Sequence, residues 1–312
     1  MSQELIFLEP VLKEMIWGGE RLKEFGYELP GANTGECWAI SAHPHGDCRV
    51  AGGRYDGAAL SGLWAEHREL FGDTDGDRFP LLVKIIDASR DLSIQVHPDD
   101  RYAAVHEQCS LGKTECWYVL DCPDGADIVI GHHAKSDKEL REMILQERWD
   151  DFLRVIPIQK GDFFQIEPGC LHAIRKGTVI LETQQSSDIT YRVYDYGRLE
   201  NGKPRQLHVR QSLEVIRVPF DEKDTRGCRS RIPAAGGTRE LLVCCPKYSV
   251  ERVCVEGKMA VNWEKPFVNV TLVEGEGLAA GLPVKKGTNF LVPAGFGSLE
   301  LEGQMELICS YL

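Results

Sequence analysis

IPIQKGDFFQIEPGCLH, residues 156–172, reads as a Lys-Gly turn, a short alternating strand, a Pro-Gly turn and a final histidine, His172. LPVKKGTNFLVPAGFGS, residues 282–298, aligns with it without a gap. The proline, the Lys-Gly pair, a phenylalanine and the glycine of the second turn coincide. An internal repeat of this kind predicts two related units in one chain. Ser298 stands in the second unit where His172 stands in the first.

Short strands separated by Gly-Asp and Pro-Gly turns are typical of closed or double-sheet β architectures. We therefore expect a mainly β protein with two cupin-like units, each a double-stranded β-helix or jelly roll, and a few surface helices. Residues 1–235 are predicted to form a catalytic, metal-binding unit with an N-terminal extension. Residues 236–312 are predicted to form a unit without metal ligands, because no histidine follows His208.

The clearest helix signal runs from Ser136 to Val155. Ser136 can cap the helix, and Glu139 follows three residues later, as in a capping box. Apolar side chains then recur at helical spacing, at Leu140, Met143, Ile144 and Leu153. We expect a surface helix packed on a β core.

Composition and charge narrow the class of protein. The 312 residues can bury a large core, and 43% hydrophobic and 27% charged residues are ordinary for a soluble globular protein. The net charge of −12 argues against nucleic acid or an anionic membrane as partner, although a local basic cluster could bind a small anion. No signal peptide or membrane-spanning run is visible. The eleven cysteines, odd in number and without a Cys-x-x-Cys pair, favour a reducing cytoplasmic location over a disulfide framework.

The stretch LSIQVHP, residues 92–98, is predicted to be a strand that ends at its proline. Its alternation places Ser93, Gln95 and His97 on one face, about 7 Å apart at each two-residue step. Three polar side chains in a row are costly to bury with nothing to bind. Taken alone, the stretch could still be a solvated strand face with an incidental histidine.

Other polar side chains stand where they could face the same pocket. Glu115 begins a strand, with Lys113 two residues earlier on the same face, and His172 follows a Pro-Gly turn. Two imidazoles, a carboxylate and the Gln95 amide suit a divalent metal that keeps an open position. Zinc is the first choice, and iron(II) or manganese also fits. The alternative for Glu115 is a simple ion pair with Lys113.

Three further charged residues lie on predicted strands. Lys84, inside an apolar strand, either reaches the surface or faces a pocket that holds an anion. Glu182 shares a strand face with Gln184, and Arg192 lies on the next strand. Both residues could instead have a structural role. Glu182 could accept hydrogen bonds from nearby donors, and Arg192 could form an ion pair with Asp188 or Asp195.

Four motifs in this order resemble the shorter bacterial form of the type I mannose-6-phosphate isomerases. They are Gln95-Val96-His97-Pro98, Gly112-Lys113-Thr114-Glu115, Pro168-Gly169 through His172, and Gln184-Gln185 through Tyr191-Arg192-Val193-Tyr194-Asp195. The resemblance runs from Trp17-Gly18-Gly19 to about Asp195, and more loosely to the end. It implies a zinc-dependent aldose–ketose isomerase that interconverts mannose 6-phosphate and fructose 6-phosphate.

The resemblance also implies roles for individual residues. By position, the ligands of one zinc ion (Zn2+) per chain are Gln95, His97, Glu115 and His172. Arg192 matches the essential arginine of the family, and Lys113 and Ser93 match residues of its substrate site.

The reaction moves a proton between C1 and C2 through a cis-enediol, so it needs a base, a stabilised oxyanion and a phosphate anchor. Glu182 is our first choice as the base and Lys113 the second. Arg192 suits the oxyanion or the phosphate, Lys84 and Lys113 add positive charge, and Ser93 can donate a hydrogen bond to the phosphate.

Two other functions are compatible with the same residues. One is an iron(II) cupin oxygenase that uses His97, Glu115 and His172, and the other is a cupin that binds a sugar phosphate without converting it. The expected partner is a small sugar phosphate, with no nucleic acid and no membrane. The oligomeric state is left open.

Overall fold

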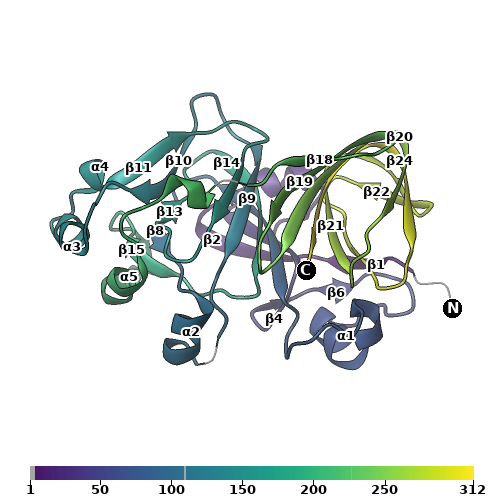
Figure 1. Ribbon diagram of the computed structural model, residues 1–312, viewed down its shortest axis with the longest axis horizontal. Coiled ribbons are helices and arrows are strands. Elements are labelled where there is room, and N and C mark those ends of the chain that lie inside the picture. The colour runs from purple at the N-terminus through teal and green to yellow at the C-terminus, as the bar shows by residue number, and fades with distance from the viewer. Residues whose placement is uncertain (1–3, 109, 226) are drawn as a thin grey trace.

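Two bodies of β-strands lie side by side in the molecule (Figure 1). The computed structural model describes residues 4–108, 110–225 and 227–312. Purple to green strands form the first body, and green to yellow strands from the C-terminal part form most of the second. The expectation of a mainly β protein with cupin-like units and a few surface helices is confirmed.

The first body contains two antiparallel sheets. The six-stranded sheet has the order β12 (Phe163–Ile166), β9 (Glu115–Asp121), β14 (Thr178–Gln185), β7 (Leu81–Ala88), β3 (Thr34–Ile40) and β2 (Val11–Gly19). The five-stranded sheet has the order β11 (Leu153–Pro157), β10 (Asp127–His132), β13 (His172–Ala173), β8 (Ile94–Val96) and β15 (Tyr191–Tyr194). Every residue of β7 and β14 is buried, so the charged side chains in these apolar strands lie inside the protein.

The second body is built on a nine-stranded sheet. Its order is β18 (Ser230–Ile232), β19 (Gly237–Cys244), β20 (Ser249–Asn262), β24 (Ser298–Tyr311), β21 (Val268–Ala279), β23 (Asn289–Val292), β1 (Ile6–Glu9) and β6 (Arg49–Val50), with β22 (Leu282–Lys285) paired to β21. The strands β20, β21 and β23 enclose an apolar core that includes Val253, Val270 and Phe290.

Strand β1 (Ile6–Glu9) pairs with β23, so a strand from the N-terminal part of the chain joins the sheet formed by the C-terminal strands. We keep the division into residues 1–235 and 236–312 as a proposal. In this view β1, β6 and β18 are strands that the first unit contributes to the sheet of the second.

The sequence repeat corresponds to a repeat of elements. The strands β11, β12 and β13 of the first stretch match β22, β23 and β24 of the second. His172 is the first residue of β13, and Ser298 is the first residue of β24. The turn glycines agree as well, because Gly161 and Gly287 have φ angles of 87° and 89°, in the left-handed region that favours glycine.

Short helices and hairpins lie at the edges of the sheets. The α-helices are α1 (Leu60–Glu66), α2 (Asp100–His106), α3 (Asp137–Leu145), α4 (Trp149–Phe152) and α5 (Val209–Val215), and the 3-10 turns are η1 (Arg21–Phe25), η2 (Arg68–Phe71) and η3 (Glu222–Thr225). Two small hairpins are β4 (Ala42–His43) with β5 (Gly46–Asp47), and β16 (Leu199–Glu200) with β17 (Lys203–Pro204). Across the described ranges, none of the helices has both the length and the apolar character needed to cross a bilayer.

The predicted helix over residues 136–155 is wrong in its second half. Ser136 caps α3 as expected, by accepting a hydrogen bond from the backbone N–H of Glu139. The helix ends at Leu145, however, and Glu147 adopts a φ of 53°, so that only the separate short helix α4 (Trp149–Phe152) continues the helical conformation. Leu153 and the residues after it join strand β11, because pairing with β10 satisfies their backbone in the sheet.

Candidate metal centre and active-site pocket

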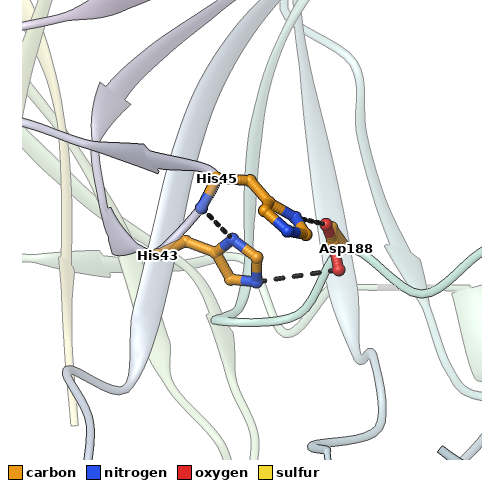
Figure 2. Close-up of side chains that lie close together, drawn as sticks. All are labelled: His43, His45 and Asp188. Carbon is orange, nitrogen blue, oxygen red and sulfur yellow. Dashed lines mark hydrogen bonds and ion pairs between the residues drawn. The ribbon is translucent and has the colours of Figure 1, made fainter.

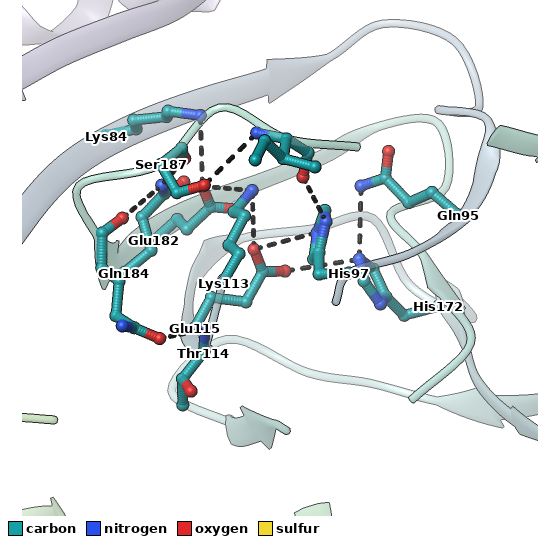
Figure 3. A network of polar contacts seen from close by, with 12 residues as sticks. Lys84, Gln95, His97, Lys113, Thr114, Glu115, His172, Glu182, Gln184 and Ser187 are labelled. Carbon is teal, nitrogen blue, oxygen red and sulfur yellow. Dashed lines mark hydrogen bonds and ion pairs between the residues drawn. The ribbon is translucent and has the colours of Figure 1, made fainter. Parts of the chain in front are cut away.

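Three buried side chains from different strand ends meet in the first body (Figure 3). They are His97 just after β8, Glu115 at the start of β9 and His172 at the start of β13, and none is more than 1% exposed. His97 Nε2 lies 3.3 Å from Glu115 Oε2, and His172 Nε2 lies 3.4 Å from Glu115 Oε1. The possible ligand atoms of all three residues lie within 4.8 Å of one another.

Hydrogen bonds set the tautomer of both histidines. His97 Nδ1–H donates to the carbonyl of Ile189 at 2.8 Å, and His172 Nδ1–H donates to the carbonyl of Cys170 at 2.9 Å. Each Nε2 therefore presents a lone pair towards the carboxylate. Burial lowers the pKa of both imidazoles, to about 3 for His97, where the charge of Lys113 adds to the effect.

This arrangement leaves acceptors facing acceptors. His97 Nε2 and both oxygens of Glu115 are buried without a hydrogen-bond partner, although Lys113 Nζ lies 2.8 Å from Glu115 Oε2 as an ion pair. Buried polar atoms without partners are costly, and a cation between them removes that cost. Two imidazole nitrogens and a carboxylate are a donor set that suits a divalent metal with an open coordination position.

Gln95 lies beside these three residues and is paired with His172 across β8 and β13. Its amide nitrogen, rather than its oxygen, faces His172 Nε2 at 3.3 Å (Figure 3). An amide nitrogen donates hydrogen bonds and does not bind metal ions, whereas a half-turn about the last torsion would exchange it with the oxygen. The role of Gln95 as a fourth ligand stays a prediction.

A second buried carboxylate, Glu182 on β14, lies next to the three residues. Its Oε1 lies 3.4 Å from Lys84 Nζ and 3.6 Å from Lys113 Nζ, and Trp117 Nε1–H donates to its Oε2 at 3.3 Å. Burial raises the pKa of Glu182, and the charge of Glu115 raises it further. Burial alone would lower the pKa of Lys113, but Glu115 and Glu182 outweigh it and raise the pKa above its ordinary value.

A cavity of about 320 Å³ opens beside this network. The six-stranded sheet contributes Lys84 and Glu182 to its wall, and Ser93, Gln95 and Arg192 come from β8 and β15 or beside them. Of the residues predicted from the sequence, the lining includes Lys84, Ser93, Gln95, Lys113, Glu182 and Arg192. Every site residue predicted from the sequence therefore either lines this cavity or belongs to the group of His97, Glu115 and His172 beside it.

Several pocket residues were missed by sequence reasoning or interpreted otherwise. Glu36 on β3 lines the cavity and accepts a hydrogen bond from Trp38 Nε1 at 2.7 Å. Lys13, His45 and Arg205 also line it. They come from β2, the turn of the β4–β5 hairpin and the segment after β17, and no local pattern marks them as pocket residues.

Asp188 and Asp195, the two residues suggested as ion-pair partners of Arg192, form hydrogen bonds with other residues. Asp188 accepts from His45 Nδ1 at 2.6 Å and lies 3.6 Å from His43 Nε2 (Figure 2). Asp195 pairs with Arg198 and Arg205. Within the described ranges, Arg192 Nε is buried without a hydrogen-bond partner, so this guanidinium can donate a further hydrogen bond at the pocket wall.

The cluster of His43, His45 and Asp188 differs from the His97, Glu115 and His172 set. The backbone N–H of His45 donates to His43 Nδ1 at 3.2 Å, so the neutral ring of His43 carries its proton on Nε2, facing Asp188 (Figure 2). Donors therefore face acceptors in this cluster, unlike the lone pairs that face one another in the His97, Glu115 and His172 set.

The fold and the buried His-Glu-His set define a class, a cupin-type β protein built around a candidate metal centre. Residues 5–120 match the model of the phosphomannose isomerase type I catalytic domain, and residues 238–312 match the model of the mannose-6-phosphate isomerase cupin domain. The chain is 47% identical to the mannose-6-phosphate isomerase ManA of Bacillus subtilis over 100% of both chains.

Two more comparisons agree with these matches. The mannose-6-phosphate isomerase of Streptococcus mutans is 45% identical over 99% of this chain and 98% of its own. The crystal structure of the Bacillus subtilis mannose 6-phosphate isomerase superposes with a TM-score of 0.97 at 46% identity, over 99% of this chain and 100% of that chain. The chain belongs to the type I mannose-6-phosphate isomerase family, whose members are metal-dependent aldose–ketose isomerases.

Proposed function

We propose that the pocket beside the His97, Glu115 and His172 set is where this isomerase interconverts mannose 6-phosphate and fructose 6-phosphate. The observation that carries the proposal is the buried group of acceptor atoms from these three residues at the edge of a cationic cavity, among which His97 Nε2 and both Glu115 oxygens have no hydrogen-bond partner in the described ranges. An oxygenase has little use for the lysines and arginines that line this cavity, and a simple binding protein has little use for a positioned base.

We assign one divalent ion, with zinc as first choice, to His97, Glu115 and His172, with Gln95 as the fourth ligand. Zinc is favoured because two imidazoles and a carboxylate with an open position are a donor set typical of catalytic zinc sites. When bound, the ion would supply Lewis-acid stabilisation of negative charge on the substrate oxygens.

Glu182 is the base in this proposal. Its carboxylate takes the proton from C2 of mannose 6-phosphate, and the C–H electron pair becomes the C1–C2 double bond as the π pair of the C1=O bond moves onto O1. The proton of the C2 hydroxyl passes to O1, the C2=O bond forms, and the electron pair of the C1–C2 double bond takes the proton back from the same carboxyl at C1. Trp117 holds Oε2 and leaves Oε1 without a hydrogen-bond partner, and a raised pKa makes the carboxylate a stronger base.

Lys113 was our second choice as the base. Its Nζ lies 2.8 Å from Glu115 Oε2 and 3.6 Å from Glu182 Oε1, and contact with two carboxylates favours the ammonium form, which supports a role in binding the substrate instead. Lys84 and Lys113 place positive charge beside Glu182, while Ser93 and Arg192 offer donors to the substrate from the opposite wall.

We also propose that the protein works in the reducing cytoplasm. The cysteine usage of the sequence supports this location, and so do the ten cysteines in the described ranges, which are free thiols.

A coupled assay on the purified protein tests the proposed function. Mannose 6-phosphate is supplied, and fructose 6-phosphate formation is followed before chelation, after chelation and after zinc or manganese is restored. We expect activity to fall on chelation and to return with the metal. Binding of mannose 6-phosphate without any conversion by the metal-loaded protein would contradict the proposal.

A further inference from the structure

A turn of the second unit reaches the strand ends that form the candidate metal centre. Residues 245–248 connect β19 to β20, and Lys247 in this turn donates a hydrogen bond from Nζ to Asp100 Oδ2. Asp100 is the first residue of α2 and lies three positions after His97. The second unit is therefore bonded to the segment that directly follows a candidate metal ligand of the first.

The carboxylate of Asp100 holds two further donors on its other oxygen. Oδ1 accepts hydrogen bonds from the backbone N–H of Gly112 at 2.8 Å and from Gln185 Nε2 at 2.9 Å. Gln185 Oε1 in turn accepts from the backbone N–H of Thr114 at 3.0 Å. These contacts fix the backbone of residues 112–115, the segment that carries both the proposed substrate lysine and the carboxylate of the metal centre.

Donors on both oxygens keep Asp100 ionised. Burial would raise the pKa of this carboxyl, but hydrogen bonds from Lys247, Gln185 and Gly112 outweigh it and lower the pKa. The side chains of Asp100 and Lys247 are each 39% exposed, so their ion pair is partly screened and adds little to overall stability. Its main consequence is the geometry of the groups that Asp100 holds.

A glycine at position 112 permits an unusually close contact at this point. A Cβ on Gly112 would lie 2.3 Å from the backbone carbon of Asp99 and 2.8 Å from the carbonyl oxygen of Pro98. The backbone N–H of Lys113 also donates to the Pro98 carbonyl at 3.0 Å. The chain that follows His97 and the chain that precedes β9 therefore touch backbone to backbone, and Asp100 bonds the two together.

The same turn also contacts the strand beside β9. Tyr248 is only 1% exposed, and its hydroxyl donates to Gln165 Oε1 at 3.3 Å. Gln165 on β12 lies opposite Cys116, the residue after Glu115. The turn is thus anchored by a buried side chain, which gives Lys247 a defined position from which to hold Asp100.

We infer that Lys247 is a positioning residue through which the second unit acts on the reaction in the first. It holds Asp100, and Asp100 holds residues 112–115. The side chains of Lys113 and Glu115 are thereby kept in place beside the substrate and the metal centre. This inference rests on the proposed function and deepens it, because it gives the unit without metal ligands a part in catalysis. A displacement of about 1 Å at a reacting group can cost about 100-fold in rate.

The test compares Lys247→Met with Lys160→Met. Lys160 Nζ lies 3.6 Å from a carboxylate oxygen of Glu274, so each variant removes one lysine from an ion pair between the two units. Lys247 is bonded to Asp100, whereas Lys160 lies in the turn between β11 and β12. Lys247→Arg, Asp100→Ala and the double variant of Lys247→Met with Asp100→Ala complete the set.

Three quantities are measured for each full-length variant, together with its melting temperature. They are the dissociation constant for zinc, the steady-state kinetics of the zinc-loaded enzyme with mannose 6-phosphate, and the amide hydrogen exchange of residues 112–115 in the metal-free protein. All are measured well below the melting temperature, so that a loss of global stability alone leaves them unchanged.

We expect Asp100→Ala to weaken zinc binding and to lower kcat/KM by about 10- to 100-fold, the scale of a lost contact that supports a metal ligand. Lys247→Met should change both by about three- to tenfold, because its ion pair is partly exposed, and should speed amide exchange of residues 112–115. Lys247→Arg should restore all three quantities, and Lys160→Met should leave them unchanged. In the double variant, Lys247→Met should add nothing to Asp100→Ala, since the lysine acts through that carboxylate.

Three results would overturn the inference. They are a change in melting temperature alone in Lys247→Met, equal losses in Lys160→Met, and losses that add up in the double variant. Hydrogen exchange separates this inference from the proposed function, because it requires neither metal nor substrate. Exchange at residues 112–115 that depends on Lys247 in a protein without isomerase activity would retain the positioning contact and reject the reaction.

Discussion

Glu115 in the first unit and Glu251 in the second are both fully buried carboxylates with opposite surroundings. Glu251 on β20 is held by donors alone, since Arg239 contacts both of its oxygens and Trp263 Nε1–H donates to Oε2 at 3.0 Å. Glu115 faces the lone pairs of two imidazoles, and its oxygens have no hydrogen-bond partner. The donors around Glu251 give it a structural role, whereas Glu115, with Lys113 on one oxygen and two imidazole lone pairs beside it, suits the coordination of a metal ion.

The repeated turns make the same contrast at the level of the backbone. Gly169 and Gly295 have φ angles of 82° and 72°, and each precedes a strand by three residues. The residue that opens that strand is buried His172 in the first unit and exposed Ser298 in the second. Similar turns therefore produce similar backbone conformations. A residue at the strand end can serve as a metal ligand only where it is buried beside other ligand atoms.

Removing a ligand from the metal centre should have the largest effect. In His172→Ala we expect metal content to fall from about one ion per chain to near zero and activity to fall about a thousandfold or more, since a bound metal contributes several kcal/mol. Elemental analysis and the coupled assay measure both quantities. Arg192→Ala is the control, because it should lose turnover and keep its metal; loss of metal there would give Arg192 a structural role.

Replacing the proposed base should cost almost as much. Glu182→Gln should lower kcat by about 10²- to 10⁴-fold, the usual contribution of a general base, with metal content unchanged. Exchange of the C2 hydrogen of mannose 6-phosphate with deuterated solvent should slow in parallel. Normal exchange in this variant would transfer the role of base to another residue.

Glu251, the buried carboxylate of the second unit, should affect the stability of the fold and not the catalytic rate. Glu251→Gln leaves the buried Arg239 without its counter-charge, and we expect a loss of about 3 kcal/mol in the free energy of unfolding. Urea titration measures it, and kcat should be unchanged. Glu302→Gln breaks the exposed pair with Lys258 and should cause no measurable loss. Equal losses in the two variants would contradict the assignment.

Acid should weaken a contact between the two units. Burial raises the pKa of Glu306, but hydrogen bonds from Arg252 and Tyr118 outweigh it, and the pKa is lowered. This carboxylate therefore contributes stability above its unfolded pKa of about 4.3, and the contribution is lost as pH falls through the lower folded value. Unfolding free energies measured below about pH 5 should fall less steeply in Glu306→Gln. A slope identical to that of the unmodified protein would show that this pair has no part in acid sensitivity.

Restoring the missing histidine of the repeat should have the smallest effect. Ser298→His should leave metal content at about one ion per chain and change stability by no more than about 0.5 kcal/mol, as is usual for an exposed site. Binding of a second ion would mean that the turn alone is enough to create the site.

The repeat, its turns and the residue types of the candidate metal ligands are readable from the amino-acid sequence alone. Glycine turns and alternating strands are local features, so they are readable in the chain and agree with the φ angles and strand boundaries observed. The same locality explains why His97, Glu115 and His172 could be identified as inward-facing donors before their distances were known.

Which side chains share the pocket, and which hydrogen bonds and ion pairs they form there, could be read only from the tertiary structure. Arg205 and His45 reach the pocket from hairpin segments with no local pattern, and Asp188 turned out to bind His45. The helix after Ser136 gave way to strand β11 because β10 offered backbone pairing. Periodicity determines the face on which a residue lies, but packing between distant strands determines which side chains that face contacts. The position of Glu115 between Lys113 and two imidazole nitrogens is a consequence of that packing.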